Sequence, residues 1–272
     1  MNDTMPENLA PPVLNVAYAS DRGPSGKRQE DALMVDRSVL QADLLPPTAR
    51  RFEAGNLLLA IADGIGGSPS GDVASKALLM ALDSLYFSED SSELLEGGWI
   101  TPSFLTSVHA RFVNVLENDK HTFGSGSTLV VAQIRDNRLC ILNVGDSPAY
   151  LFHEGGIRLI SHPHSGPPGL LARYVDAEEE GVYLSRPLTS AFIADRQSKS
   201  IQIATVEMEF PHDAGLLLCS DGLSDLLHES GLLRNLDWSI SPRQQVEAWL
   251  AAAKGAGPQD NISLVWVRQG RH

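Results

Sequence analysis

The sequence has little cysteine and no long hydrophobic run. Its two cysteines, Cys140 and Cys219, both lie inside apolar stretches. We expect small buried strand residues in a reducing compartment rather than a disulfide or a catalytic nucleophile. No apolar run is long enough to span a bilayer, and residues 1–12 lack the basic start and apolar core of a signal peptide. These absences predict a cytoplasmic protein with no membrane partner.

The chain also lacks an excess of positive charge. It has 21 Lys and Arg residues against 34 Asp and Glu residues, which gives a net charge of −13. Nucleic acids and anionic membranes are bound by clustered Lys and Arg, so neither is expected as a partner. No repeat, heptad pattern or low-complexity linker divides the 272 residues. We therefore expect a disordered, proline-containing tail over residues 1–12 and one domain over residues 13–272.

The most informative stretch runs from Leu57 to Ser75. Residues 57–62 are all apolar, which predicts a strand buried on both faces. Asp63 follows, and the glycine-rich turn that starts at Gly64 can bring a backbone carbonyl against whatever Asp63 binds. Beyond it, apolar residues recur at three- and four-residue steps and predict a helix. This apolar stripe comprises Val73, Ala74, Ala77, Leu78, Ala81, Leu82 and Leu85. Asp63 is thus expected between two rigid elements.

The rest of the chain contains further strand and helix patterns. Strands are expected at residues 13–19, 32–36, 127–134, 139–144, 149–152, 201–208, 215–219 and 262–267. A helix at 102–119 has an apolar stripe of Phe104, Leu105, Val108, Phe112, Val115 and Leu116, and another helix is expected at 242–253.

Three connections complete this reading of the chain. Residues 127–152 are expected to form an antiparallel meander. Residues 40–56, which contain Pro46 and Pro47, are expected to be a surface excursion, and residues 162–199 an irregular lid. Runs of strands with helices in separate blocks predict an α+β fold.

Acidic residues mark the ends of several predicted strands. A single Asp at such a place is usually a turn or helix cap, but four at equivalent places favour a shared site. These four are Asp63, Asp146, Asp221 and Asp260, and Glu30 and Asp31 stand at the start of another strand. A ligand set of oxygens without His or Cys selects Mg²⁺ or Mn²⁺ over Zn²⁺.

Six motifs occur in the order and spacing of the protein phosphatase 2C-like, metal-dependent Ser/Thr phosphatases. They are SDRGPSGKRQEDALMVD, LLLAIADGIGGSPSGDVAS, GSTLVVAQI with LCILNVGDSPAYLF, RPLTSAF, LLLCSDGLSDLL and QDNISLVWV. The chain resembles this family from about Val16 to Val267. The resemblance implies a four-layer α-β-β-α sandwich, in which two antiparallel sheets are flanked by helices and a metal site lies at one end.

The resemblance also implies a set of metal ligands. By the family pattern, Asp63 bridges two ions of Mg²⁺ or Mn²⁺. The Gly64 carbonyl and Glu30 then serve one ion, and Asp221 and Asp260 serve the other.

Two more carboxylates complete this set. By the same pattern Asp31 helps through a bound water, and Asp146, with Asp221, matches the position of a third ion in bacterial-type members. The implied activity is hydrolysis of phosphoserine and phosphothreonine in proteins that a Ser/Thr kinase has phosphorylated. Two cations can neutralise the phosphoryl oxygens and lower the pKa of an attacking water, so no nucleophilic Cys or Ser motif is required.

One departure from the family pattern concerns the phosphate-binding arginine, whose position is Gly26 here. Because residues two apart share a face of an extended strand, Arg28 is expected to take over this role and Lys27 to face away. A solvated surface arginine is the competing interpretation of Arg28. Gly26 also supports a second hypothesis, a catalytically weak or silent phosphatase-like domain that binds signalling partners. The complete set of carboxylates favours catalysis, and hydrolysis of a small phosphoester remains a third hypothesis.

Overall fold

The computed structural model describes residues 13–24, 27–53, 55–65, 70–153, 156–165, 188–198, 200–230 and 236–270. The expected tail, Gly26 and most of the expected lid lie outside these ranges. The strands form two six-stranded antiparallel sheets and one short pair.

The first sheet has the order β10-β9-β13-β14-β1-β4. Its members are β1 (Val13–Asp21), β4 (Leu44–Glu53), β9 (Ala149–His153), β10 (Gly156–Leu159), β13 (Gly215–Cys219) and β14 (Ile262–Gln269). The second sheet has the order β12-β8-β7-β5-β2-β3. Its members are β2 (Asp31–Val35), β3 (Ser38–Leu40), β5 (Asn56–Asp63), β7 (Leu129–Arg135), β8 (Arg138–Val144) and β12 (Ala204–Glu209). The short pair joins β6 (Gly126–Ser127) and β11 (Phe192–Ile193).

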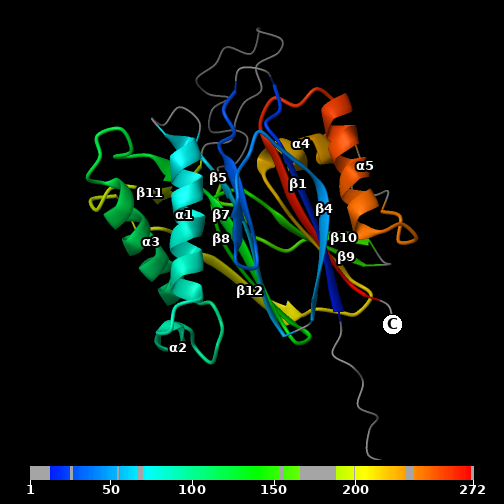
Figure 1. Ribbon diagram of the computed structural model, residues 1–272, viewed down its shortest axis with the longest axis horizontal. Helices are drawn as coiled ribbons and strands as arrows, with labels where there is room; N and C mark the ends of the chain where they lie inside the picture. The colour runs from blue at the N-terminus through cyan, green and yellow to red at the C-terminus, as the bar shows by residue number, and fades with distance from the viewer. Residues whose placement is uncertain are drawn as a thin grey trace, which may run out of the picture.

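Helices cover the outer faces of the two sheets (Figure 1). They are α1 (Gly71–Tyr86), α2 (Ser91–Leu94), α3 (Pro102–Leu116), α4 (Asp221–Ser230) and α5 (Pro242–Gly255). In Figure 1, α1 and α3 stand on one side of the sheets and α4 and α5 on the other. This arrangement confirms the expected α-β-β-α sandwich. None of the described helices has the length and apolar character of a membrane span.

Three hydrophobic cores hold the four layers together, and β5 explains how. Leu57, Leu59 and Ile61 point into the core between the sheets, whereas Leu58 and Ala60 point into the core under α1 and α3. Since both faces of β5 are buried, its sequence shows no polar alternation. The third core lies between the first sheet and the helices α4 and α5.

Two helices begin at capping residues that are common at helix N-termini. The Thr101 hydroxyl accepts a hydrogen bond from the backbone N–H of Phe104 at 3.2 Å, and Pro102 is the first residue of α3. At α5, Ser241 and Gln244 form a reciprocal capping box. Such caps satisfy N–H groups that have no partner inside the helix.

The expected excursion at residues 40–56 is wrong, because β4 occupies most of it. This strand pairs with β1 at the edge of the first sheet. Pro46 and Pro47 stand at a register shift between the pairs Tyr18↔Thr48 and Ser20↔Leu45. An edge strand with a bulge tolerates proline, because the missing N–H groups are not needed by a second neighbour.

The structure also corrects three other expectations from the sequence. The expected meander breaks after β8, because β9 lies in the other sheet, beside β13 and β10. The helix α4 was not predicted. Val73 and Val115 were assigned to buried stripes, but their residues are 41% and 62% exposed. Cys140 and Cys219 are buried and unpaired, as predicted.

Candidate metal centre

The predicted carboxylates lie at strand ends on one edge of the sandwich. Asp63 ends β5 and lies directly opposite Asp31, the first residue of β2. Asp146 follows β8, Asp221 opens α4 after β13, and Asp260 precedes β14. The charges of Asp31, Asp146, Asp221 and Asp260 all act on Asp63, so the fold brings these five groups together.

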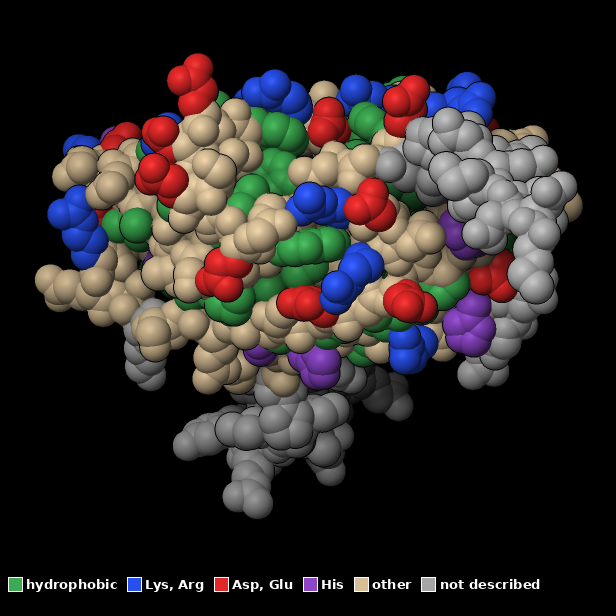
Figure 2. Space-filling view, turned by 90° about the horizontal axis from the view of Figure 1, so that it is seen from below, with side chains coloured by type: hydrophobic (Ala, Val, Ile, Leu, Met, Phe, Trp, Pro, Cys, Tyr) green, Lys and Arg blue, Asp and Glu red, His purple; other side chains and the backbone are tan. Residues whose placement is uncertain are grey.

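This edge is the upper end of the molecule in Figure 1. The helix α2, which follows the C-terminal end of α1, lies at the bottom there, so α1 begins and β5 ends at the top. Figure 2 shows the opposite end, where basic and acidic side chains are interspersed with hydrophobic ones.

The backbone around Asp63 is held by neighbouring hydroxyl groups. The Asp63 N–H donates to Thr128 Oγ1 at 3.2 Å, and Ser127 Oγ and the Thr128 N–H donate to the Asp63 carbonyl at 3.0 and 2.8 Å. Thr128 Oγ1 also lies 2.8 Å from Ser147 Oγ, next to Asp146. Two candidate ligands therefore share one hydrogen-bonded support.

The Gly64 backbone is held between Glu30 and the start of α1. Its N–H donates to the Glu30 carbonyl at 3.1 Å, which joins the loop before β2 to the end of β5. A Cβ at this position would lie 2.2 Å from the Gly71 carbonyl oxygen, so only glycine fits. The start of α1 is thereby packed against the Gly64 backbone.

Asp31 is the most enclosed of the polar candidates. Its Oδ2 accepts a hydrogen bond from Ser220 Oγ at 2.8 Å. Its Oδ1 is buried and has no hydrogen-bond partner. A buried carboxylate oxygen without a partner is costly unless a water or a cation completes it.

Burial and mutual repulsion raise the pKa values of these carboxyl groups. Burial first, and then the neighbouring carboxylates, raise the pKa of Asp31 and of Asp146 to about 7 and the pKa of Asp63 well above its ordinary value. The pKa of Asp221 is also raised, mainly by burial and by Asp260, although a hydrogen bond with Asp63 opposes the shift. The pKa of Glu30 is raised by burial and then by Asp260. Like charges held this close favour either protons or a cation.

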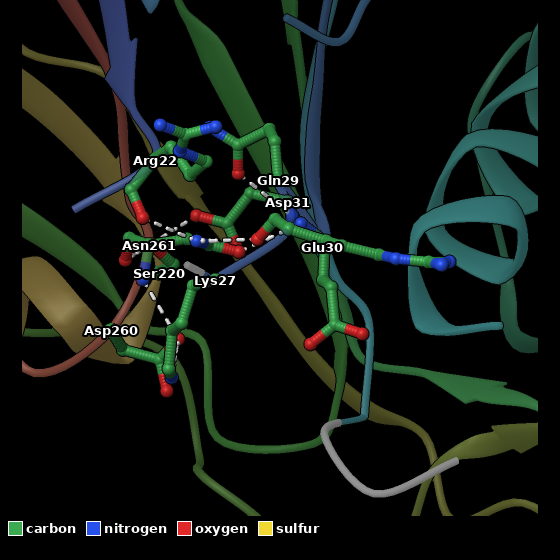
Figure 3. A network of polar contacts seen from close by, with 9 residues as sticks. Arg22, Lys27, Gln29, Glu30, Asp31, Ser220, Asp260 and Asn261 are labelled. Carbon is green, nitrogen blue, oxygen red and sulfur yellow. Dashed lines mark hydrogen bonds and ion pairs between the residues drawn. The ribbon is translucent and has the colours of Figure 1, made fainter. Parts of the chain in front are cut away.

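The loop before β2 places its two basic residues differently from expectation. Lys27 Nζ lies 2.7 Å from Asp260 Oδ1, so the prediction that Lys27 faces away is wrong (Figure 3). The reason is that residues 27–30 are not part of a strand, and the strand parity used for the prediction does not apply to them. Arg28 lies 3.8 Å from Asp72, and its side chain is 75% exposed.

Three supporting residues were not singled out from the sequence. Asn261, Ser220 and Thr128 bond to the loop before β2, to Asp31 and to Asp63, respectively. All three lie inside the motifs quoted above. Ser220 and Asn261 adjoin the candidate ligands Asp221 and Asp260 in the sequence, which was the available signal for them, whereas Thr128 adjoins none.

The donor set, oxygen atoms of carboxylates and of one carbonyl, fits a divalent cation. Among the described residues, no three acidic, histidine or cysteine side chains form a ready-made ligand group for one ion. Instead the carboxyl groups pair with each other and with Lys27. The unpartnered Asp31 Oδ1 and the raised pKa values are what cation binding would relieve.

Comparisons with known proteins show two similar phosphatases. Serine/threonine phosphatase stp of Listeria welshimeri is 27% identical over 216 residues, which cover 78% of this chain and 84% of that protein. Serine/threonine protein phosphatase PstP of Mycobacterium tuberculosis is 28% identical over 256 residues, which cover 93% of this chain but 44% of that protein.

Solved structures show the same fold. The crystal structure of the M. tuberculosis phosphatase PstP/Ppp matches with a TM-score of 0.71 and 25% identity, over 95% of this chain and 100% of that one. The PstP catalytic domain in complex with two manganese ions matches with a TM-score of 0.68 and 27% identity, over 96% and 100%. A family model described as protein phosphatase 2C matches residues 41–253, most of the chain. This chain therefore belongs to the protein phosphatase 2C family.

Proposed function

We propose that the chain is a metal-dependent protein phosphatase that hydrolyses phosphoserine and phosphothreonine. The observation that carries the proposal is the convergence of carboxylates on Asp63, at the place that the family pattern gives to its metal ligands. All the acidic residues that the pattern requires are present. This favours catalysis over a silent binding domain.

Five residues would hold the two ions. In this proposal Asp63 would contribute to both, Glu30 and the Gly64 carbonyl would hold one, and Asp221 and Asp260 would hold the other. Bound Mg²⁺ or Mn²⁺ would supply positive charge for the phosphoryl oxygens and acidify the attacking water. The protein's own contribution is to hold these oxygen donors on rigid strand ends.

The remaining candidates would act around this pair. Asp31 would orient a water through its free Oδ1, and Asp146 with Asp221 would offer a third cation position. Arg28 would bind the phosphoryl group. Its guanidinium group is exposed, and its 3.8 Å contact with Asp72 is long enough to be broken at little cost.

The biological setting is also part of the proposal. Phosphorylated proteins made by a Ser/Thr kinase are the proposed substrates, and the activity of the named relatives supports this choice. The two buried, unpaired cysteines are compatible with a reducing, cytoplasmic location. Residues 13–272 would act as one catalytic domain.

The test is phosphopeptide turnover with Mn²⁺ or Mg²⁺ and with chelator. We expect release of phosphate that requires the metal and is lost in Asp221→Asn. Asp213→Asn is the matched control, because Asp213 is exposed and precedes β13, whereas Asp221 follows the same strand. Turnover that survives chelation, or that falls equally in both variants, would contradict the proposal.

A further inference from the structure

The side chain of Asn261 joins three backbone groups of the loop before β2. Its Oδ1 accepts from the Glu30 N–H at 2.7 Å, and its Nδ2 donates to the carbonyls of Arg22 and Arg28 at 2.7 and 2.9 Å (Figure 3). The residue is only 3% exposed. One amide group therefore satisfies three backbone groups that are far from it in the sequence.

These contacts span the two halves of the candidate metal centre. Asn261 follows Asp260, and its own N–H donates to Asp260 Oδ1 at 2.7 Å. Its side chain meanwhile fixes the loop that carries Lys27, Arg28 and Glu30. The ligand proposed for one ion is thus tied to the ligand proposed for the other.

The packing beneath the loop is tight. Gly23 has a φ of +74°, and a Cβ there would lie 2.3 Å from the Asp260 carbonyl oxygen. A second glycine, Gly222, packs against the next carbonyl group, because a Cβ at Gly222 would lie 2.1 Å from the Asn261 carbonyl oxygen. The loop and the start of α4 therefore rest directly on the Asp260–Asn261 backbone, and the amide has a defined place between them.

We infer that Asn261 is a positioning residue that sets the distance between Glu30 and Asp260 and thereby the affinity of the site for its metal ions. The inference rests on the proposed function, since it concerns the same site. Only an amide combines an acceptor for the Glu30 N–H with donors for two carbonyls in this geometry. Losing it leaves three partly buried backbone groups without this partner and frees the loop to move away from Asp260.

If Asn261 only stabilised the fold, its loss would lower stability without a specific effect on metal binding. Gln133 is the control residue for that case. Its side-chain amide also bonds several groups, accepting from the Ile100 N–H at 2.8 Å and donating to Asn56, Tyr86 and Gly98. Gln133 pairs with Leu58, five residues before Asp63 on β5, so it lies about 17 Å from the metal centre at about 3.3 Å per residue. It is a buried amide of similar bonding without a link to the site.

The experiment compares Asn261→Ala with Gln133→Ala in the full chain. Both variants should melt at lower temperature than the unmodified chain, because each loses several hydrogen bonds that are at least partly buried. Only Asn261→Ala should weaken Mn²⁺ binding, measured by titration calorimetry, by about tenfold to a hundredfold, as is typical when a group that orients metal ligands is removed. If Asn261→Ala does not fold, Asn261→Ser, which can keep one of the three contacts, is measured in its place.

A second measurement separates this inference from the proposed function. In the metal-free chain, the Glu30 amide should be protected from hydrogen exchange and should lose that protection in Asn261→Ala. Unchanged Mn²⁺ affinity in a folded Asn261 variant, equal losses in the Gln133 variant, or an unprotected Glu30 amide in the unmodified chain would each overturn the inference. Absence of phosphopeptide turnover by the unmodified chain, with Mn²⁺ affinity still dependent on Asn261, would instead contradict the proposed function and support the inference.

Discussion

Asp31→Asn should make the metal-free protein more stable at high pH while weakening its hold on metal. Burial, opposed by the hydroxyl groups of Ser220 and Ser263 and reinforced by the charges of Asp221 and Asp260, raises the pKa of Asp31 from 3.8 to about 7. The folded chain therefore binds more protons than the unfolded chain between these two values, and stability falls as the pH rises through this range. Asparagine cannot ionise, so it removes this loss.

The size of the effect follows from the shift. Roughly three pKa units at about 1.4 kcal/mol each give about 4 kcal/mol against folding once Asp31 is fully ionised. The new Nδ2 would stand where Oδ1 has no partner, at a cost of about 1–3 kcal/mol. A net gain of about 1–3 kcal/mol at pH 8 remains. At pH 5 most of the gain is absent, because the folded Asp31 is still protonated there.

Urea unfolding in the presence of chelator, at pH 5 and at pH 8, measures this directly. The free energy of unfolding of the variant minus that of the unmodified chain should be about 2–3 kcal/mol larger at pH 8 than at pH 5. The cost of the unpaired amide does not affect this comparison, because it is the same at both pH values. Added Mn²⁺ should stabilise the variant less than the unmodified chain. A relative stability that is the same at both pH values would refute the reasoning.

Three further predictions concern the same site. Asp63→Asn and Asp221→Asn should abolish phosphopeptide turnover yet keep cooperative unfolding, and unchanged turnover at saturating Mn²⁺ would show that the site is misplaced. Arg28→Ala should raise the KM for a phosphopeptide by tens of fold, since a charge-assisted contact contributes about 2 kcal/mol; an unchanged KM at saturating Mn²⁺ would remove Arg28 from the site. Calorimetry should show tighter Mn²⁺ binding in Lys27→Ala, because the Lys27 ammonium group, 2.7 Å from Asp260 Oδ1, would compete with a cation for that oxygen, and unchanged affinity would contradict this. All variants should be compared at one ionic strength, because salt screens the exposed charges.

Much of this protein could be predicted from the sequence because the signals are local. The unbroken apolar run at residues 57–62 gives a strand buried on both faces, and the three- and four-residue spacing after Ser70 gives α1. Acidic residues directly after such runs are placed at strand ends by the chain itself. The order of six motifs was then enough to indicate the family, which the match over residues 41–253 confirms.

Only the tertiary structure decided how distant segments pair and which charges meet. Pro46 and Pro47 argue against regular structure locally, yet β4 forms because β1 offers an open edge and a bulge. Lys27 meets Asp260, which is 233 residues away, and Asn261 reaches back to the loop before β2. Pairing across a sheet edge and attraction between charges depend on distance in space, and sequence spacing does not carry that distance.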